Sequence, residues 1–195
     1  ILFNRSRLMI GHFLMKPCGR ILKCDMRTDI YNAETSGTII TDKGSIRFEV
    51  FVHSLDMGII VKTDASSGEN GFTWQWVSDS PNSPRYDKFK ASGNTSKVVR
   101  EYKENASAVV DEENRTALFT YLNGGQTAVR WHISGKGSAR SLYVTCAHSY
   151  PDHNALQLSR EYLDRILKPS YSKLKKTHRE WWNNFYQKSF VSLPD

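Results

Sequence analysis

The six histidines are the residues with which this chain could carry out acid–base or metal chemistry: His12, His53, His132, His148, His153 and His178. None belongs to an HExxH motif, and no two lie four residues apart on a predicted helix, so the patterns of zinc hydrolases are absent. His148 and His153 flank a loop that ends in Asp152, and such a loop could present a histidine beside a carboxylate. The same residues also suit an ordinary polar connection between a strand and a helix, and we favour that interpretation.

Carboxylates are the other candidates, because glycoside hydrolysis requires two of them facing each other across the sugar. Residues 111–113 are three adjacent acids in a charged turn, and neighbouring side chains on a loop do not form such a pair. Glu34, Asp56 and Asp79 are isolated in the sequence. There is no GxSxG nucleophile motif and no glycine-rich phosphate-binding motif. We therefore predict no catalytic residue, no metal site and no cofactor in this chain.

The cysteines are Cys18, Cys24 and Cys146, and they form no CxxC pair. An odd number excludes a full disulfide framework, and the spacing matches no zinc site. Cys18 and Cys24 could pair if two strands brought them together. Buried free thiols are the interpretation we favour.

The formal net charge of +7 raises the question of an acidic partner such as nucleic acid. The basic residues are scattered, and their densest cluster lies on a predicted helix between residues 168 and 188. A solvated helix face explains that cluster better than a phosphate-binding stripe, because the neighbouring aromatic residues suit helix packing. We expect no nucleic-acid partner. No apolar run approaches the length that a membrane span requires.

Residues 21–149 show the pattern of short strands separated by turns. Residues 36–41 and 45–52 flank a glycine-containing turn, and Ile46, Phe48, Val50 and Val52 alternate with the intervening residues. This alternation predicts a β-hairpin. Further strands are predicted at residues 57–61, 72–77, 97–102, 117–121, 127–134 and 141–147, with a loop at 78–96. Many short strands without helices between them predict a mainly β, antiparallel β-sandwich (supersandwich-like) fold.

The tryptophans of this region allow two interpretations. Trp74 and Trp76 share one face of a predicted strand, and Trp131 lies on another. An exposed aromatic platform could stack on sugar rings. Alternating aromatic residues on a strand are more often part of a sandwich core, and we predict core positions for Trp74 and Trp76.

Two helices are predicted at the C-terminal end, over residues 154–167 and from Pro169–Ser170 onward. The second carries an amphipathic stripe of Tyr171, Leu174, His178, Trp181 and Phe185. We predict that this stripe, including Trp181, is buried against the sandwich or, in a longer protein, against a following domain. Trp182 lies about 100° around the helix, so we expect it to meet a second partner. Residues 190–195 are predicted to be extended.

Several stretches resemble a known family: residues 29–37, 51–57, 124–128, 147–152 and 178–195. They are similar to the N-terminal domain of bacterial glycosidases related to the α-L-fucosidase family (glycoside hydrolase family 95), especially Bacteroides-type members. The H-x-x-W-W-x-x-F pattern that begins at His178 is the most specific part. The opening strand departs from the family, because its glycine-rich pattern is reduced to residues 7–12, and we expect the first strands to be truncated.

The resemblance implies a domain organisation. Residues 1–150 would form the sandwich, 151–189 a helical linker, and 190–195 the start of an (α/α)6 barrel that carries the catalytic carboxylates. No catalytic residue of the family can be placed on this chain. The linker residues expected to pack between domains are Leu174, His178, Trp181, Trp182 and Phe185. The loops expected to reach the substrate cleft are 80–86, through Arg85 and Tyr86, and the connection that holds His148, Asp152 and His153.

The leading hypothesis is therefore a non-catalytic N-terminal domain whose partner is the catalytic domain of the same polypeptide, with carbohydrate as an indirect partner. An independent carbohydrate-binding module is the alternative. A mutarotase-like epimerase would need a histidine and a carboxylate in a sandwich cleft. The candidates for these residues are His53 with Asp56, or His132. Residues 1–10 carry no signal peptide, and we interpret the chain as starting inside a longer product that is periplasmic or secreted in a bacterium.

Overall fold

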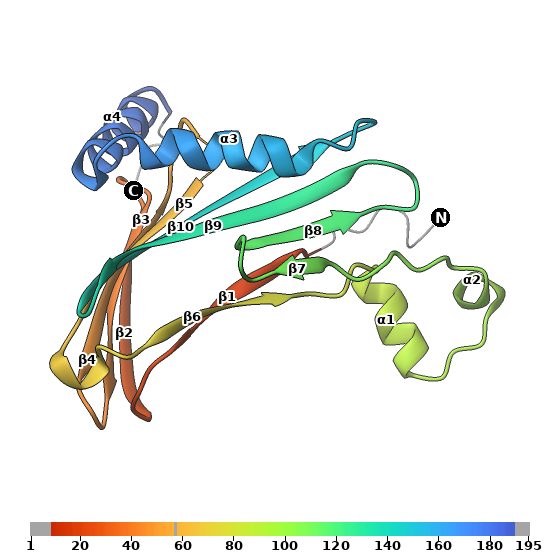
Figure 1. The fold of residues 1–195 in the computed structure, drawn as a ribbon, viewed down its shortest axis with the longest axis horizontal. Helices are drawn as coiled ribbons and strands as arrows, with labels where there is room; N and C mark the ends of the chain where they lie inside the picture. The colour runs from red at the N-terminus through yellow and green to blue at the C-terminus, as the bar shows by residue number, and fades with distance from the viewer. Residues whose placement is uncertain (1–8, 57, 190–195) are drawn as a thin grey trace, which may run out of the picture.

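The computed structural model describes residues 9–56 and 58–189, which fold as a mainly β structure (Figure 1). Eight strands form one antiparallel sheet in the order β2-β3-β4-β5-β10-β9-β8-β7, and β1 pairs with β6 in a second sheet. The strands of the large sheet are β2 (Ile21–Asp29), β3 (Glu34–Thr41), β4 (Ser45–Val52), β5 (Gly58–Ala65), β7 (Val109–Asp111), β8 (Thr116–Thr120), β9 (Gln126–Lys136) and β10 (Ala139–Ser149). The small sheet holds β1 (Gly11–Lys16) and β6 (Thr73–Ser78). The prediction of an antiparallel, mainly β fold is confirmed.

The β3–β4 hairpin forms where the alternation predicts it. The amide of Thr41 donates to the carbonyl of Gly44 over 2.8 Å, and the amide of Gly44 donates to the Thr41 hydroxyl over 3.0 Å. A Cβ at residue 44 would lie 2.0 Å from the Ser66 hydroxyl oxygen, so this turn requires glycine. The predicted strand at 57–61 is β5, although Met57 itself lies outside the described residues, as do residues 190–195.

The two sheets pack face to face through aromatic side chains. Trp76 of β6 stacks on Trp131 of β9 with ring centroids 5.9 Å apart, and Phe13 of β1 meets both rings edge-on. Trp76 and Trp131 are buried and Trp74 is partly buried against the same core. The core interpretation of Trp74 and Trp76 is therefore correct. We call the face of the large sheet that meets β1 and β6 its inner face.

A buried carboxylate fixes the connection between the two sheets. Glu69, in the short 3-10 helix η1 (Ser67–Glu69), is fully buried. It accepts hydrogen bonds from the amides of Cys18 and Gly19 and from the hydroxyl of Thr41. These donors satisfy a charged group that burial alone would destabilise, because a buried ion needs partners to replace water.

Two helices cover the opposite, outer face of the large sheet (Figure 1): α3 (Ala155–Leu167) and α4 (Tyr171–Lys188). Leu163 and Ile166 of α3 and Leu174 of α4 form one cluster with strand residues of β4, β5 and β10. The close fit at β5 explains Gly58, because a Cβ there would lie 2.9 Å from the Ile166 side chain. Both helices agree with the prediction. None of the described helices is long and apolar enough to cross a bilayer.

Residues 84–100 correct the sequence prediction. Residues 84–91 were expected to be a loop and 97–102 a strand, but they form helices α1 (Pro84–Ala91) and α2 (Lys97–Arg100). Pro84 is the first residue of α1, where its fixed φ suits a helix start and its missing N–H costs nothing. The Tyr86 ring stacks on Tyr102 at 4.0 Å, so a local aromatic contact holds a segment whose serines and prolines resemble loop residues.

The cysteines also differ in part from expectation. All three are free, as favoured, but Cys18 and Cys24 are exposed and only Cys146 is partly buried. Cys24 lies on β2, the edge strand of the large sheet, most of whose residues are exposed. Among the described residues, no group of three or more histidine, cysteine, aspartate or glutamate side chains could hold a metal ion.

Candidate functional site

Helix α4 begins at a serine cap and runs across strands β3 and β4. Ser170 is extended in conformation, and its hydroxyl accepts from the amide of Lys173 over 3.4 Å. Pro169 ends the preceding helical pattern and sets the start of the next. The helix thereby presents its first half to the outer face of the sheet.

The buried line of α4 runs through Leu174 and His178, which are both almost fully buried. The His178 ring lies 4.8 Å from the Phe51 ring of β4. Its Nε2 lies 3.2 Å from the carbonyl oxygen of Ala33, and since a carbonyl only accepts, this nitrogen carries the hydrogen. Burial lowers the pKa of His178, so the neutral ring is the stable form in this interface.

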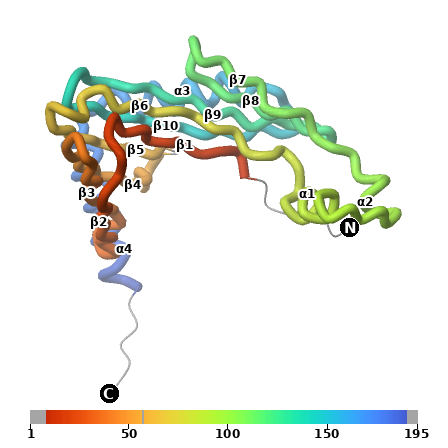
Figure 2. Tube along the Cα trace, turned by 90° about the horizontal axis from the view of Figure 1, so that it is seen from below, coloured from red at the N-terminus to blue at the C-terminus, as the bar shows by residue number. Residues whose placement is uncertain are grey.

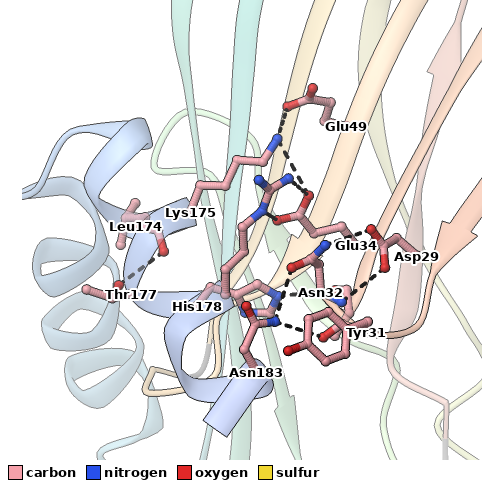
Figure 3. Close-up of polar contacts among 12 residues, drawn as sticks. Asp29, Tyr31, Asn32, Glu34, Glu49, Leu174, Lys175, Thr177, His178 and Asn183 are labelled. Carbon is pink, nitrogen blue, oxygen red and sulfur yellow. Dashed lines mark hydrogen bonds and ion pairs between the residues drawn. The ribbon is translucent and has the colours of Figure 1, made fainter. Parts of the chain in front are cut away.

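Two carboxylates on the sheet bind cations from α4 beside this buried line (Figure 3). The Arg179 guanidinium donates to both oxygens of Glu34, over 2.5 and 2.6 Å. The Lys175 ammonium lies 2.8 Å from Glu49 and 3.6 Å from Glu34. The Tyr171 hydroxyl donates to the same Glu49 oxygen over 2.7 Å.

The hydrogen bonds from Lys175 and Tyr171 lower the pKa of Glu49. Burial and the bond to Glu49 raise the pKa of Tyr171, so its hydroxyl stays protonated as a donor. A general acid needs a carboxyl whose pKa is raised. Glu49 has the opposite shift and therefore suits anchoring of the helix rather than proton donation. Glu34 is held in a two-point ion pair with Arg179, which serves the same anchoring. Glu34 and Arg179 also border a small polar hollow of about 230 Å³ on the sheet surface.

One helical turn after Arg179, Asn183 of α4 binds the connection between β2 and β3. Asn183 donates to the carbonyl oxygen of Tyr31 over 3.3 Å and to the side-chain oxygen of Asn32 over 3.2 Å. Asn32 is fixed in turn by Asp29, which accepts from its side-chain and backbone N–H groups. Two of the stretches that carry the family resemblance, residues 29–37 and 178–189, thus contact each other directly in the fold (Figure 3).

The aromatic residues near the end of α4 contact one another but differ in exposure. Trp181 and Phe185 are 39% and 42% exposed, and their parallel rings stack on each other at 5.6 Å with an interplanar angle of 4°. Trp182 is half-buried, with its ring 6.4 Å from His178 and 5.8 Å from Tyr186. Trp181 therefore does not pack on the sandwich. Trp182, for which a second partner is expected, instead contacts His178, because these two residues are four apart on the helix.

The residues predicted to reach a substrate cleft lie in two separate places. Arg85 is exposed on α1, whereas Tyr86 is buried and its hydroxyl donates to Glu104 over 2.7 Å, so Tyr86 offers no polar reach. His148, Asp152 and His153 are exposed at the connection from β10 to α3, where the His148 Nδ1 lies 3.0 Å from the Thr127 hydroxyl. Figure 1 places α1 on the side of β1 and β6 and this connection on the side of α3.

The histidine and carboxylate of the epimerase hypothesis do meet. His53 Nδ1 lies 3.1 Å from an oxygen of Asp56, and Arg165 lies 3.4 Å from the other oxygen. The His53 ring is buried beneath α4, with its Nε2 3.1 Å from the Thr177 hydroxyl. A catalytic base must reach its substrate, and this ring instead contacts the helix. His132 is partly exposed on β9, and burial lowers its pKa.

Sequence reasoning missed the anchoring residues Glu34, Glu49, Lys175 and Arg179. The two acids are isolated in the sequence and come together only because β3 and β4 are neighbours. A usable signal was present on the helix: Lys175 and Arg179 are four residues apart and each follows a residue of the apolar stripe. Such cations border the buried face, where a carboxylate partner is expected.

Comparison with known proteins gives a likeness of fold only. No protein-family model matches the chain, and no curated protein matches it in sequence. Among solved structures, a chain assigned as a kojibiose phosphorylase from the human microbiome matches 91% of this chain with a TM-score of 0.53 and 12% sequence identity. A bacterial glucoamylase in complex with acarbose matches with a TM-score of 0.48 and 9% identity. This chain spans 28% of the first neighbour's length and 31% of the second's.

Proposed function

We propose that this chain is a non-catalytic N-terminal β-sandwich domain of a glycoside hydrolase, related to the α-L-fucosidase family (glycoside hydrolase family 95), and that it supports a following (α/α)6 catalytic barrel. The fold supports this, because it is similar to a part of a much longer carbohydrate-active protein. The family resemblance of residues 178–195 supports the narrower assignment. The export expected of such an enzyme, to the periplasm or outside a bacterium, belongs to the same proposal.

The observation that carries the proposal is the exposed pair of Trp181 and Phe185. The first half of α4 is fixed to the sheet by Leu174 and by the Glu34–Arg179 ion pair, so the helix is a rigid support. Its last turns then present two large aromatic side chains to solvent. Exposed aromatic surface at one place on a soluble protein marks an interaction site. A following domain that packs on this pair would cover it.

The experiment compares this 195-residue chain with the longer polypeptide of which we propose it is part. The longer protein should release aryl alcohol from at least one nitrophenyl glycoside, whereas this chain alone should release none. Replacing Trp181 and Phe185 by alanine should lower the unfolding temperature of the longer protein more than that of this chain, because only there is the pair covered. A turnover by this chain that disappears when Glu34 or Glu49 is changed to the amide would contradict the proposal.

An independent carbohydrate-binding module is the second candidate, and the same aromatic pair favours it. Stacked, exposed rings can bind the apolar face of a sugar. In that case this chain should bind soluble polysaccharides in affinity electrophoresis, and Trp181→Ala should abolish the retardation. Tyr150→Ala is the matched control, because Tyr150 is exposed but distant in sequence from α4. Retardation that depends on Trp181 would support the binding module over the domain-packing role.

A further inference from the structure

The β2–β3 connection and the last turns of α4 together form one exposed apolar surface. Tyr31 of the connection is 50% exposed and stacks on Tyr186 of α4, with ring centroids 5.9 Å apart. The Tyr186 ring meets Phe185 at 5.5 Å, and Phe185 stacks on Trp181. Ile30, which precedes Tyr31, is 70% exposed. The four rings form a continuous series of contacts, and we call them, together with Ile30, the α4-end surface.

Hydrogen bonds hold the two parts of this surface in one arrangement (Figure 3). Asn183 of α4 donates to the carbonyl oxygen of Tyr31 and to the side-chain oxygen of Asn32. Asn32 donates in turn to Asp29. A surface that is already ordered loses little conformational entropy when a partner binds. An ordered apolar surface of this kind on a soluble protein marks an interaction site.

The place of this surface in the chain indicates which partner covers it. Helix α4 ends at Lys188, two residues after Tyr186. The polypeptide that follows therefore leaves α4 beside the surface, and it begins with a largely apolar segment, residues 190–194. A partner that is joined to the surface in this way has a high effective concentration there, so it needs few further contacts to stay bound.

We infer that the polypeptide continuing from Ser189 packs on the whole α4-end surface, so that the β2–β3 connection forms the second half of an interface between domains. This inference rests on the proposed function, which supplies the following domain, and it adds Ile30 and Tyr31 to the pair of Trp181 and Phe185. Contact with a strand connection and a helix at once would fix the orientation of that domain on the sandwich, because two separate contacts prevent rotation about either one.

A sugar fits this surface less well than a protein domain does. Stacked rings can bind the apolar face of a sugar, but the hydroxyl groups of the sugar also need polar partners. The Asn183 amide lies among these rings, and its bonds to Tyr31 and Asn32 use both of its N–H groups. The ring faces and Ile30 remain, and they favour an apolar protein surface.

The test measures unfolding in three lengths of the polypeptide: a chain that ends at Ser189, this 195-residue chain and the longer polypeptide. In the two shorter chains, Ile30→Glu should change the equilibrium constant of unfolding less than about threefold, as other surface substitutions do. In the longer polypeptide it should raise that constant at least about tenfold, because the following domain would bury an unpaired charge. The amides of residues 30–33 should also exchange hydrogen more slowly in the longer polypeptide than in this chain.

Val109→Glu is the matched control. Val109 is 69% exposed and lies on β7, at the opposite edge of the large sheet from β2. Figure 2 shows β7 well apart from α4. The same charge at Val109 should therefore have an equal effect in all three lengths. Ile30→Ser removes the apolar side chain without adding a charge, and it should act in the same direction as Ile30→Glu with a smaller effect.

The inference is overturned if Ile30→Glu and Val109→Glu are equivalent in the longer polypeptide. It is also overturned if this chain is retarded by a polysaccharide and Ile30→Glu abolishes the retardation, or if it sediments as a dimer that Ile30→Glu dissociates. A large effect of Ile30→Glu that appears already in this chain, but not in the chain ending at Ser189, would assign the contact to residues 190–195 and support the inference. If the longer polypeptide shows the expected effect but releases no aryl alcohol, the interface is supported and the catalytic part of the proposed function is contradicted.

Discussion

The two halves of α4 both carry aromatic side chains, but the first half is buried against the sheet and the second half is partly exposed. From Tyr171 to Arg179 the helix is anchored, with Leu174 in the core and with Lys175 and Arg179 paired to Glu49 and Glu34. From Trp181 to Phe185 one side of the helix lies in solvent. The difference arises from what lies beneath the helix: strands β3 and β4 under the first half, and only the β2–β3 connection near the second.

Amphipathic periodicity therefore identifies a helix, but it does not show how much of the apolar side of that helix is covered by the sheet. The stripe through Tyr171, Leu174, His178, Trp181 and Phe185 is continuous in sequence, yet the sheet covers only part of it. The rest of the stripe is a surface without a partner among the described residues. Variants of the two halves should therefore differ sharply in their effect on the stability of this chain.

The largest effect is expected for Leu174→Ala, in the anchored half. Leu174 is 2% exposed and packs among Phe51, Ile60 and Ile166, so the truncation leaves a cavity. We expect a loss of about 2–5 kcal/mol in the free energy of unfolding. Urea denaturation measures it, with Lys176→Ala on the exposed face of the same helix as the control. A loss below about 1 kcal/mol would mean that α4 is not packed on the sheet.

The next effect concerns the ion pair of Arg179 and Glu34. Arg179→Ala removes two charge-assisted hydrogen bonds and leaves Glu34, which is mostly buried, with Lys175 alone. Because the Arg179 side chain is partly exposed, we expect a moderate loss of about 1–2 kcal/mol. A double-mutant cycle with Glu34→Gln isolates the pair. Additive effects of the two substitutions would show that the pair contributes nothing to anchoring.

These residues also show what the sequence could predict. Period-2 alternation and a glycine turn were sufficient for β3 and β4, and Pro169 with Ser170 located the start of α4. The spacing of Lys175 and Arg179 indicates that these cations border the buried face, but it does not identify Glu34 as the partner of Arg179, because the two residues are 145 apart in sequence. The sequence does not show which of Trp181 and Trp182 is the more buried, because both fit a helical stripe. The position of the β2–β3 connection determines that it is Trp182.

The elements that were missed share a physical cause. Helix α1 is stabilised by the Tyr86–Tyr102 stack and by the hydrogen bond from Tyr86 to Glu104, which no local pattern reveals. Val98 and Val99 favour a strand by propensity, but Val99 is buried against Tyr86 in the single turn of α2. Strand β1 required knowledge of β6, its partner across more than fifty residues. Tertiary contact overrides local preference in each case.

A smaller effect, on pH dependence, is expected for His178. Burial lowers its pKa in the folded chain, whereas the unfolded chain binds a proton near the ordinary value of about 6.5. Folding is therefore favoured above that value, and stability is lost as the pH falls through it, by at most about 1.4 kcal/mol per pH unit for one group. His178→Gln keeps an N–H donor for the Ala33 carbonyl and should reduce this slope. Because burial shifts the pKa of His132 in the same direction, part of the slope should remain.

The pH series is measured as urea midpoints of the wild-type chain and His178→Gln between about pH 7 and pH 5. The double variant His132→Gln, His178→Gln should be flatter than either single variant. An identical slope in wild type and His178→Gln would mean that the buried ring does not determine the acid sensitivity of this interface.

The smallest effect in this chain is expected for Trp181→Ala, in the exposed half. The ring is already 39% exposed, and its ring contacts are with Phe185 and Trp182 of the same helix, so its removal should cost only about 0.5–1 kcal/mol. Trp182→Ala should cost more, about 1–2 kcal/mol, because that ring contacts His178 and Tyr186. This order reverses the one expected from the helical stripe alone. In the longer polypeptide proposed above, covering the pair would raise the cost of Trp181→Ala to that of a buried tryptophan, about 3–5 kcal/mol. Denaturant midpoints of both variants in both proteins decide the matter: if Trp181→Ala costs the same in each, no following domain packs on this side of α4, and the exposed aromatic pair serves a different partner.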